Sequence, residues 1–131
     1  MEKDFFTVPQ KAVITKDRKM LILKRAPDAH VFPEHWDFPG GKLEHDENPK
    51  EGLKREVNEE TALEIDAGKP VFVFVEKVHD HSAVIIVYES KFVSGEVKLS
   101  NEHTEWKWAS KEKIMELKCE PYVKEYLKER D

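Results

Sequence analysis

Apolar residues gather in short runs along the chain, and the spacing of these runs is strand-like in some segments and helix-like in others. Residues 5–15 and 20–23 are rich in aliphatic and β-branched residues, and the polar turn between them predicts a hairpin. Pro9 lies inside the first run, which favours a bulge or an edge strand there. Residues 26–35 contain two prolines and are expected to form an irregular loop before a short strand at 36–38.

The second half of the chain contains further strand-like runs. Continuous apolar segments at 71–75 and 83–88 are typical of strands that are covered on both faces. Residues 91–99 are expected to continue the second of these strands or to add another, and residues 105–109 to form a short strand.

The clearest helix signal begins at Asn48, which is a favourable N-cap. Pro49 suits the first helical position, and Glu51 lies where a capping box has its acidic residue. This helix should run to about Thr61 or Leu63.

Two more helices are expected near the C-terminal end, one capped by Ser110 and one opened by Pro121. The second carries apolar residues on one face, at i,i+4 spacing. These residues are Tyr122, Val123, Tyr126 and Leu127. Strands and helices together predict a mixed sheet with helices packed on it, which is an α/β domain.

Length and composition favour one domain over residues 1–131 and limit its partners. The formal net charge of −5 argues against the basic footprint that nucleic-acid binding needs. An acidic protein can still bind a polyphosphate when divalent cations bridge the like charges. Cys119 is the single cysteine, the N-terminal residues lack a signal-peptide pattern, and no apolar run is long enough to span a membrane. A cytoplasmic protein without a membrane or nucleic-acid partner is therefore expected.

Three glutamates of the helix, Glu56, Glu59 and Glu60, fall within one arc, because a helix turns by about 100° per residue. Leu53 and Val57 lie beside this arc and can seat the helix on the sheet. Like charges this close repel, so at least one pKa should rise unless a counterion is bound. Carboxylate oxygens suit Mg²⁺ or Mn²⁺. A glutamate-rich helix taken alone is more often a solvated face, so the neighbouring residues decide.

These neighbours form a pattern with fixed spacing: a glycine, five residues, a glutamate, seven residues, then R-E-V-N-E-E and an aliphatic residue three positions further on. The pattern resembles the Nudix box of the Nudix hydrolase family, and the preceding W-D-F-P-G-G is also similar. The specific matches are Gly41, Glu47, Arg55, Glu56, Glu59 and Glu60. The resemblance covers the whole chain and is most specific over residues 36–63.

Two positions depart from the family pattern. Ala62 stands where the family has a glycine, and alanine in a left-handed helix terminus costs roughly 1–2 kcal/mol. We therefore expect the helix to continue past Ala62 or the turn to be built differently. Asp46 stands where relatives often have glycine, and aspartate tolerates positive φ better than most residues.

The resemblance implies a Nudix-like α/β/α sandwich with a mixed β-sheet. It also implies Mg²⁺-dependent hydrolysis of a nucleoside diphosphate linked to another moiety, with Mn²⁺ as a possible substitute. On this basis Glu59 and Glu60 are metal ligands, Glu56 is a ligand or the general base, and Glu56 and Glu59 are the catalytic residues. The Gly40 carbonyl is a further metal ligand by resemblance.

Residues around the box have roles implied in the same way. Glu102 is favoured over Glu105 as an additional metal ligand from a late loop, with a solvated loop as the alternative. Arg55 and Glu47 are expected to brace the loop against the helix, and Gly41 to support the site. For Arg55 and Glu47 a purely structural role is the favoured one.

Residues outside the box are expected to choose the substrate. Arg25 and Lys42 could contact phosphates or be ordinary surface cations, and Trp36 could stack on a base, although core packing is the more common role for it. Other aromatic candidates are more often core residues, and two histidines of the predicted turn after 71–75 are more often solvated. These residues are Phe5, Phe6, Phe32, Tyr88, Trp106, His79 and His81.

The substrate expected first is a nucleoside triphosphate, cleaved by a pyrophosphatase of the housecleaning type. The alternatives are hydrolysis of a dinucleoside polyphosphate or of ADP-ribose and other nucleotide sugars. An alternative from another class is a catalytically silent nucleotide-binding module. A homodimer is possible by analogy with relatives.

Overall fold

The computed structural model describes residues 5–130, in which eight strands form one mixed sheet. The strands are β1 (Phe6–Thr7), β2 (Pro9–Lys16), β3 (Lys19–Arg25), β4 (Trp36–Asp37), β5 (Gly40–Lys42), β6 (Glu64–Val78), β7 (His81–Ser94) and β8 (His103–Ala109). The helices are α1 (Pro49–Thr61), α2 (Lys111–Met115) and α3 (Pro121–Glu129). The α/β class expected from the sequence is confirmed. Residues 1–4 and 131 lie outside the described part. The expected domain bounds of 1–131 and the expectation about the N-terminal residues include these positions.

The first hairpin forms where the sequence predicts it, with β2 and β3 antiparallel. The expected edge position for Pro9 is wrong, because β2 lies inside the sheet, with β7 on one side and β3 and β5 on the other. Pro9 is tolerated because it is the first residue of its strand. The first apolar run is split before it, and β1 and β2 both pair with β7 in parallel and in one continuous register.

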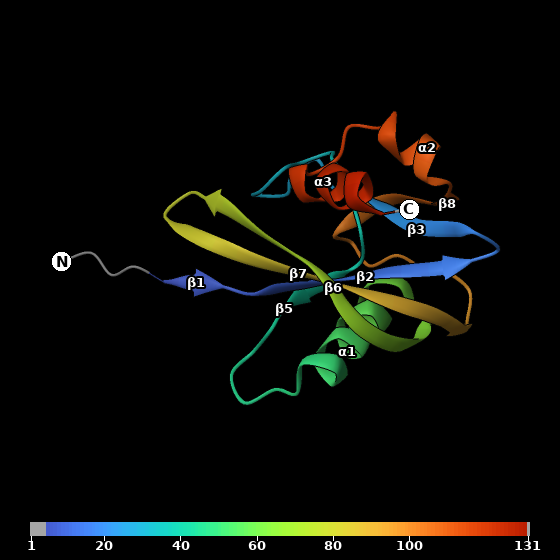
Figure 1. Cartoon of the computed structure of the whole chain (residues 1–131), viewed down its shortest axis with the longest axis horizontal. Helices are drawn as coiled ribbons and strands as arrows, with labels where there is room; N and C mark the ends of the chain where they lie inside the picture. Colours follow the sequence, from blue (N-terminus) through green and yellow to red (C-terminus); the bar gives the residue numbers. More distant parts are fainter. Residues whose placement is uncertain (1–4, 131) are drawn as a thin grey trace.

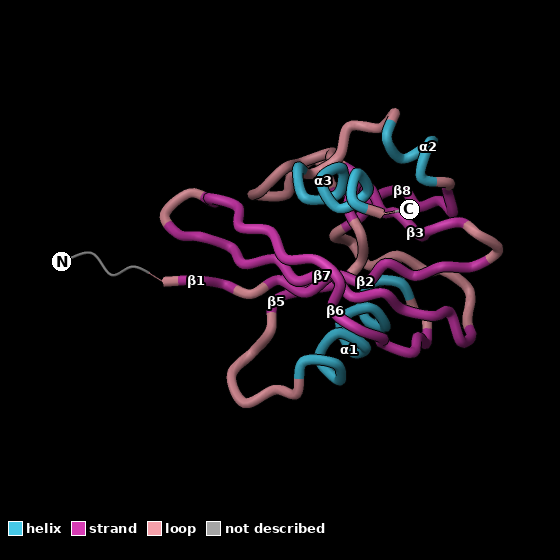
Figure 2. Tube along the Cα trace, viewed as in Figure 1, coloured by secondary structure: helices cyan, strands magenta, loops and turns pink. Residues whose placement is uncertain are grey.

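The expectation that residues 71–75 are covered on both faces is wrong. Phe72 packs inward and its ring lies 5.8 Å from that of Tyr126 on α3. Val73 and Val75 point the other way and are each 58% exposed. Within the described residues β6 pairs only with β7, and the free end of this hairpin extends beyond the helices beside β1 (Figure 2). An edge strand can carry apolar residues outward here because no helix covers this end of the hairpin.

The helices cover opposite faces of the sheet, with α1 on one side and α3 on the other (Figure 1). On the α1 side, Leu53 and Val57 are fully buried against β2 and β3, as the sequence predicts. On the α3 side, the four apolar residues expected on one helix face are all buried. Burying a side chain of this size stabilises a fold by about 1.5–3 kcal/mol. These two clusters fix the sheet between its helices. In the described part, no helix has the length and apolarity that a membrane crossing requires.

The connection between β3 and β4 is the irregular loop that the prolines predict. It includes Phe32 at φ 47° and Glu34 at φ 61°. The two strands that follow are very short, and β5 was not expected from the sequence; it pairs with the start of β2. This pairing brings the glycine pair to the centre of the sheet, next to α1.

Helix α1 begins at Pro49 and ends at Thr61, as predicted, but its C-terminal turn differs from the expectation. The Asn48 side chain accepts hydrogen bonds from the backbone N–H groups of Lys50 and Glu51, at 3.1 and 3.2 Å. At the other end, Ala62 itself adopts the left-handed conformation, at φ 66° and ψ 9°, so both expected alternatives are wrong. The strain is tolerated because the Ala62 N–H bonds to the Asn58 carbonyl at 2.8 Å and the next residue, Leu63, is buried. Asp46 has φ 60°, as expected for an aspartate in a glycine position.

Replacing Ala62 by glycine is expected to stabilise the protein by about 1 kcal/mol, because glycine adopts the left-handed region without steric cost. Urea denaturation should show a higher midpoint with an unchanged slope. Ala29→Gly is the control, because Ala29 does not have a positive φ. Glycine there relieves no strain and only raises the conformational entropy of the unfolded chain. Equal effects of the two substitutions would contradict the assignment of strain to Ala62.

Candidate active site

The glycine pair of β5 lies directly against the carboxylates of α1. The Gly40 N–H donates a hydrogen bond of 2.9 Å to Oε1 of Glu60. A Cβ on Gly41 would lie 2.3 Å from Oε2 of Glu56, so only glycine leaves room for that carboxylate. A Cβ on Gly40 would lie 1.9 Å from the Gln10 carbonyl oxygen, and Gly40 has φ 151°. Both glycines are therefore required for close packing, whether or not a metal is bound.

These groups line one end of a cavity of about 790 Å³. At this end lie Gly40, Gly41, Lys42, Glu56, Glu60 and Glu102. At the other end the walls come from the loop between β3 and β4 and from the β6–β7 hairpin. They combine apolar residues with polar ones: Ala29, Val31, Phe32, Val78, Ala83 and Ile85 on the one hand, and Asp28, His30, Glu76, His79 and His81 on the other. A carboxylate-rich end and a partly apolar end in one cavity suit a ligand with a polyphosphate and an apolar group.

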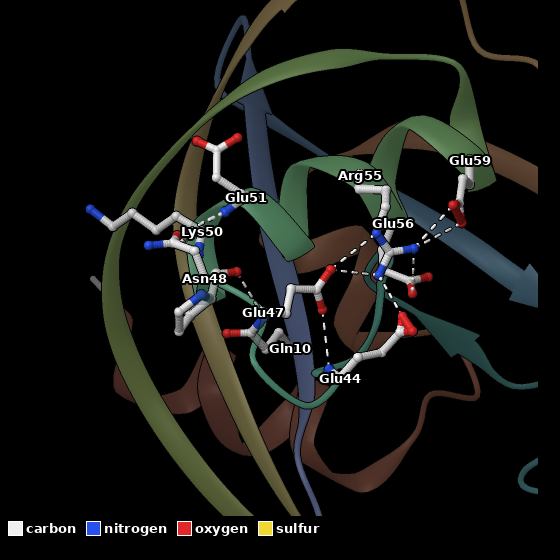
Figure 3. A network of polar contacts seen from close by, with 10 residues as sticks. Gln10, Glu44, Glu47, Asn48, Lys50, Glu51, Arg55, Glu56 and Glu59 are labelled. Atoms are coloured by element: carbon white, nitrogen blue, oxygen red, sulfur yellow. Dashed lines mark hydrogen bonds and ion pairs between the residues drawn. The ribbon is translucent and has the colours of Figure 1, made fainter.

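Arg55 is the centre of a network of carboxylates on the outer side of α1 (Figure 3). Its Nη2 donates to Oε2 of Glu47 at 2.8 Å, and its Nη1 donates to Oε1 of Glu59 at 3.0 Å. Glu44 and Glu56 lie at 3.3 Å from the same guanidinium. The hydrogen bond from Arg55, with one from the Glu44 backbone, lowers the pKa of Glu47. The expected pairing of Arg55 with Glu47 is thus present, and it ties the loop before α1 to the helix.

Gly52 is a site residue that sequence reasoning missed. A Cβ at this position would lie 2.5 Å from the Glu47 carboxyl carbon, so the glycine makes room for the carboxylate that Arg55 binds. A glycine inside a helix is unfavourable by about 1 kcal/mol relative to alanine, and this was the signal that could have revealed it.

Burial perturbs two of the three helix glutamates. It raises the pKa of Glu60 to about 8, against the opposing effects of Lys11 and the Gly40 N–H. Asp37 and Glu102 raise it further. Burial also raises the pKa of Glu56, and Glu59 and Glu102 add to this while Arg55 opposes it. Glu59 differs from both because its side chain is 57% exposed and bonded to Arg55.

Oxygen donors at the cavity end fit a divalent cation. Among residues 5–130, no three histidine, cysteine or acidic side chains converge as a ready-made ion site. Glu56, Glu60 and Glu102 nevertheless line the same cavity end, and each of the first two is destabilised as an anion by the third. A cation would relieve this repulsion, and Mg²⁺ binds with only one or two protein carboxylates. Glu59 would join only after leaving Arg55.

A second buried charge network lies beneath the cavity. Lys11 donates a hydrogen bond of 3.0 Å to Asp37, and Tyr122 donates another to the same carboxylate. Burial alone would raise the pKa of Asp37, but Lys11, with Glu120, Tyr122 and Arg25, holds it below its ordinary value. Burial and Asp37 raise the pKa of Glu120. This network also escaped sequence reasoning, because its members come from four separate elements.

The expected substrate contacts are only partly brought to the cavity. Lys42 is exposed and lines it. Arg25 lines it as well, but its guanidinium already donates to the Val31 carbonyl at 2.8 Å and to Asp37 at 3.5 Å. Trp36 lies elsewhere: it is 6% exposed in the core cluster on the α3 side. A buried indole cannot stack on a base, so the expected role of Trp36 as a substrate contact is wrong.

Other candidates divide in the same way. Phe32, His79 and His81 line the cavity, whereas Tyr88 is buried on the α1 side with its hydroxyl bonded to Gln10. Phe5, Phe6 and Trp106 are exposed and do not line the cavity. Of the two late glutamates, Glu102 lines the cavity, and Glu105 pairs with Lys24 at 3.2 Å away from it. The geometry therefore supports Glu102 over Glu105.

Comparisons with known proteins agree with this geometry. A family model described as "NUDIX domain" matches residues 9–129. A MutT-like protein of Streptomyces ambofaciens is 31% identical over 85% of this chain and 68% of the relative. A CTP pyrophosphohydrolase of Escherichia coli is 28% identical over 84% of this chain and 80% of the relative. The crystal structure of the MutT protein of Methanosarcina mazei covers 98% of this chain and 94% of its own, with a TM-score of 0.89 and 30% identity.

The buried carboxyl of Glu60 makes a prediction about stability in metal-free buffer. Its folded pKa of about 8 exceeds the unfolded value of about 4.3, so the folded state binds the extra proton between these values. Stability contributed by this group is therefore present below about pH 4 and is lost as the pH rises to about 8. Glu60→Gln should remove this loss, raising the melting temperature at pH 8 to 9 much more than at pH 5.

The control is Glu59→Gln, which removes the same charge from an exposed position on the same helix. It should leave the pH dependence of the melting temperature close to that of the wild type. If Glu60→Gln and the wild type lose stability in parallel between pH 5 and 9, burial of the Glu60 charge is not the cause.

Proposed function

The chain belongs to the Nudix family of hydrolases, and we propose that it is a magnesium-dependent nucleoside triphosphate pyrophosphatase of the housecleaning type. Family membership makes it an enzyme that hydrolyses phosphoanhydride bonds in small nucleotide substrates with a divalent metal. The identity of the metal as Mg²⁺, the substrate and the roles of individual residues are the proposal.

The cavity is the observation that carries the choice of substrate. Its volume of about 790 Å³ lies within the range of small-molecule sites, roughly 300–1,000 Å³. The carboxylate end would receive the triphosphate with its cation, and the partly apolar end the base. The name of the Escherichia coli relative, a CTP pyrophosphohydrolase, supports a nucleoside triphosphate. The products would be a nucleoside monophosphate and pyrophosphate.

The proposed metal ligands are Glu56, Glu59, Glu60, Glu102 and the carbonyl of Gly40, with Glu56 or Glu59 as the general base. When bound, Mg²⁺ would neutralise phosphate charge and activate a water molecule. Burial raises the pKa of Glu56, which makes its carboxylate a stronger proton acceptor. Arg55 holds Glu59 and Glu47 and so would set how readily Glu59 turns toward the cation. Gly41 leaves the space that Glu56 needs.

Two basic side chains at the cavity, Lys42 and Arg25, would have different roles. Lys42 is the one we assign to the substrate phosphates, because it is exposed and lines the carboxylate end. Arg25 is bonded to Val31 of the cavity wall and to Asp37 beneath it. We therefore assign Arg25 to holding the β3–β4 loop in place. Any effect of Arg25 on substrate binding would act through this loop.

The cellular compartment, the oligomeric state and the alternative substrate are also part of the proposal. A reducing cytoplasm suits the single Cys119, whose pKa burial raises to about 11, so the thiol stays protonated. A homodimer is testable by size-exclusion chromatography with light scattering. His103, which follows Glu102 in the chain, is buried and does not line the cavity, so it offers no contact that would favour a dinucleoside polyphosphate.

Hydrolysis of a nucleotide panel tests the reaction directly. With Mg²⁺, the wild type should release pyrophosphate from ribo- or deoxynucleoside triphosphates faster than it cleaves ADP-ribose or diadenosine tetraphosphate. Glu56→Gln should lower kcat by about 100-fold or more, because it removes a charged ligand or the base. Glu51→Gln is the control, an exposed glutamate of the same helix outside the cavity. Turnover of none of these compounds, or wild-type rates in Glu56→Gln, would refute the proposed reaction or the role of Glu56.

Metal binding has a readout that does not need turnover. Millimolar Mg²⁺ should raise the melting temperature of the wild type, because a ligand that binds only the folded state stabilises it by mass action. Glu60→Gln should show a smaller rise, and Na⁺ at equal ionic strength should show none in either protein. An equal rise in both proteins would place the cation away from Glu60.

A further inference from the structure

One charged residue interrupts the apolar face of β6 that is turned toward the cavity. Alternate residues of a strand share a face, so Phe72, Phe74, Glu76 and Val78 lie on the same side. Phe72, Phe74 and Val78 all pack against the core cluster on the α3 side. Glu76 is the exception within this inward-facing row, and it lines the cavity.

The nearest neighbours of Glu76 on its face of the hairpin are apolar. It is paired in register with Ala83 of β7, and Val78 and Ile85 line the same part of the cavity. Its Oε1 is buried and accepts no hydrogen bond from any described residue. A buried carboxylate oxygen without a donor is unfavourable, since it has lost water without a replacement.

Polar neighbours at this end of the cavity are already engaged with other groups. His79 contacts the His30 carbonyl at 3.3 Å, and His81 bonds to Thr7 and Asp80, each at 3.1 Å. Glu120, a buried carboxylate that also lines the cavity, has the Arg25 guanidinium at 3.9 Å. Glu76 has no such ion pair among the described residues (its strand neighbour Lys77 points to the opposite face).

A carboxylate in this position therefore has an unmet capacity to accept hydrogen bonds, and Glu76 is one of the residues that line the cavity. If the position served only packing, an apolar residue would continue the pattern of its strand at lower cost. The hairpin that carries Glu76 projects past the helices (Figure 2), and residues of this hairpin and of the β3–β4 loop both line the cavity. Glu76 lies on a strand whose register with β7 is defined, which fixes the position of its backbone.

We propose that Glu76 determines specificity, its carboxylate accepting a hydrogen bond from an exocyclic amino group of the nucleobase. The inference rests on the proposed function, which places a nucleotide base at the partly apolar end of the cavity. A base with an amino group supplies the N–H donor that Glu76 lacks. A base with a carbonyl oxygen in its place is disfavoured for two reasons: it supplies no N–H donor at that position, and its oxygen lone pairs are repelled by the carboxylate.

The test compares substrates that differ at the amino group. GTP and ITP differ only in the 2-amino group, and CTP and UTP exchange an amino group for a carbonyl oxygen. For at least one pair, wild-type kcat/KM should favour the amino base by about tenfold or more, the size of one charge-assisted hydrogen bond. Glu76→Leu should bring that ratio to within about twofold. Glu76→Gln should keep part of the preference, because its amide oxygen still accepts.

Glu89→Gln is the matched control, since Glu89 is an exposed carboxylate of the same hairpin that does not line the cavity. It should leave the ratio unchanged. Melting temperatures check that the Glu76 variants fold, and Glu76→Leu restores the apolar pattern of its strand. A wild-type ratio near one for both pairs, or a preference that survives in Glu76→Leu, would overturn the proposal.

A binding measurement separates this proposal from the proposed function. Calorimetry with GMP and IMP, and with CMP and UMP, needs neither metal nor turnover. If no triphosphate is hydrolysed but the amino-bearing monophosphate binds more tightly and loses this advantage in Glu76→Leu, the proposed reaction fails and the role of Glu76 holds. If hydrolysis occurs without such discrimination, only the role of Glu76 fails. If neither binding nor hydrolysis is detected, both fail.

Discussion

The buried carboxylate of Asp37 is the group on which the arrangement of the cavity depends. It lies on a two-residue strand, and its hydrogen-bond and ion-pair partners come from β2, β3 and α3. A charge taken out of water is strongly unfavourable unless it is paired, so Lys11, Arg25 and Tyr122 must all be in place together. Tyr122 also accepts the Phe38 N–H at 3.1 Å, which fixes the chain just before the glycine pair. Electrostatic neutralisation beneath the cavity thus sets the position of the backbone above it.

The opposite condition holds at the carboxylate end of the same cavity. Glu56 and Glu60 are crowded against Glu102 and against glycine backbone, and burial disfavours their charges. Arg55 relieves part of this crowding from the outer side, but it is exposed and shared among four carboxylates. The protein therefore has one buried site where charges are balanced and one where negative charge is in excess. This excess is the physical reason that a divalent cation and a polyphosphate can bind together to an acidic protein.

Local features of this fold were predictable from the sequence, and features set by distant residues were not. The Asn48 cap, the first hairpin and the buried Leu53 depend on neighbours in the chain, and periodicity revealed them. The exposure of Val73 depends on where the helices end on the sheet, which composition does not encode. Trp36 looked like a binding residue because tryptophan suits both a core and a base, and only its neighbours decide between them.

The candidate site shows the same division. Spacing placed Glu56, Glu59 and Glu60 on one arc of the helix, yet Glu59 is turned toward Arg55 in the structure. Helical spacing fixes the position of the Cβ but not which charged neighbour the side chain prefers. The left-handed Ala62 is a similar case: an unfavourable residue is retained because the tertiary structure requires the turn there.

The anchoring of the segment between β5 and α1 has a consequence for how this protein can change in length. Surface loops usually accept insertions, because lengthening a flexible loop adds little entropic cost. Here Glu44 and Glu47 are both tied to Arg55, and Glu47 also fits against Gly52. An extra residue would pull one carboxylate out of reach of the guanidinium or drive another into the helix. These contacts therefore fix the number of residues between Gly41, Glu47 and Arg55, and this surface segment cannot vary in length as surface loops usually do.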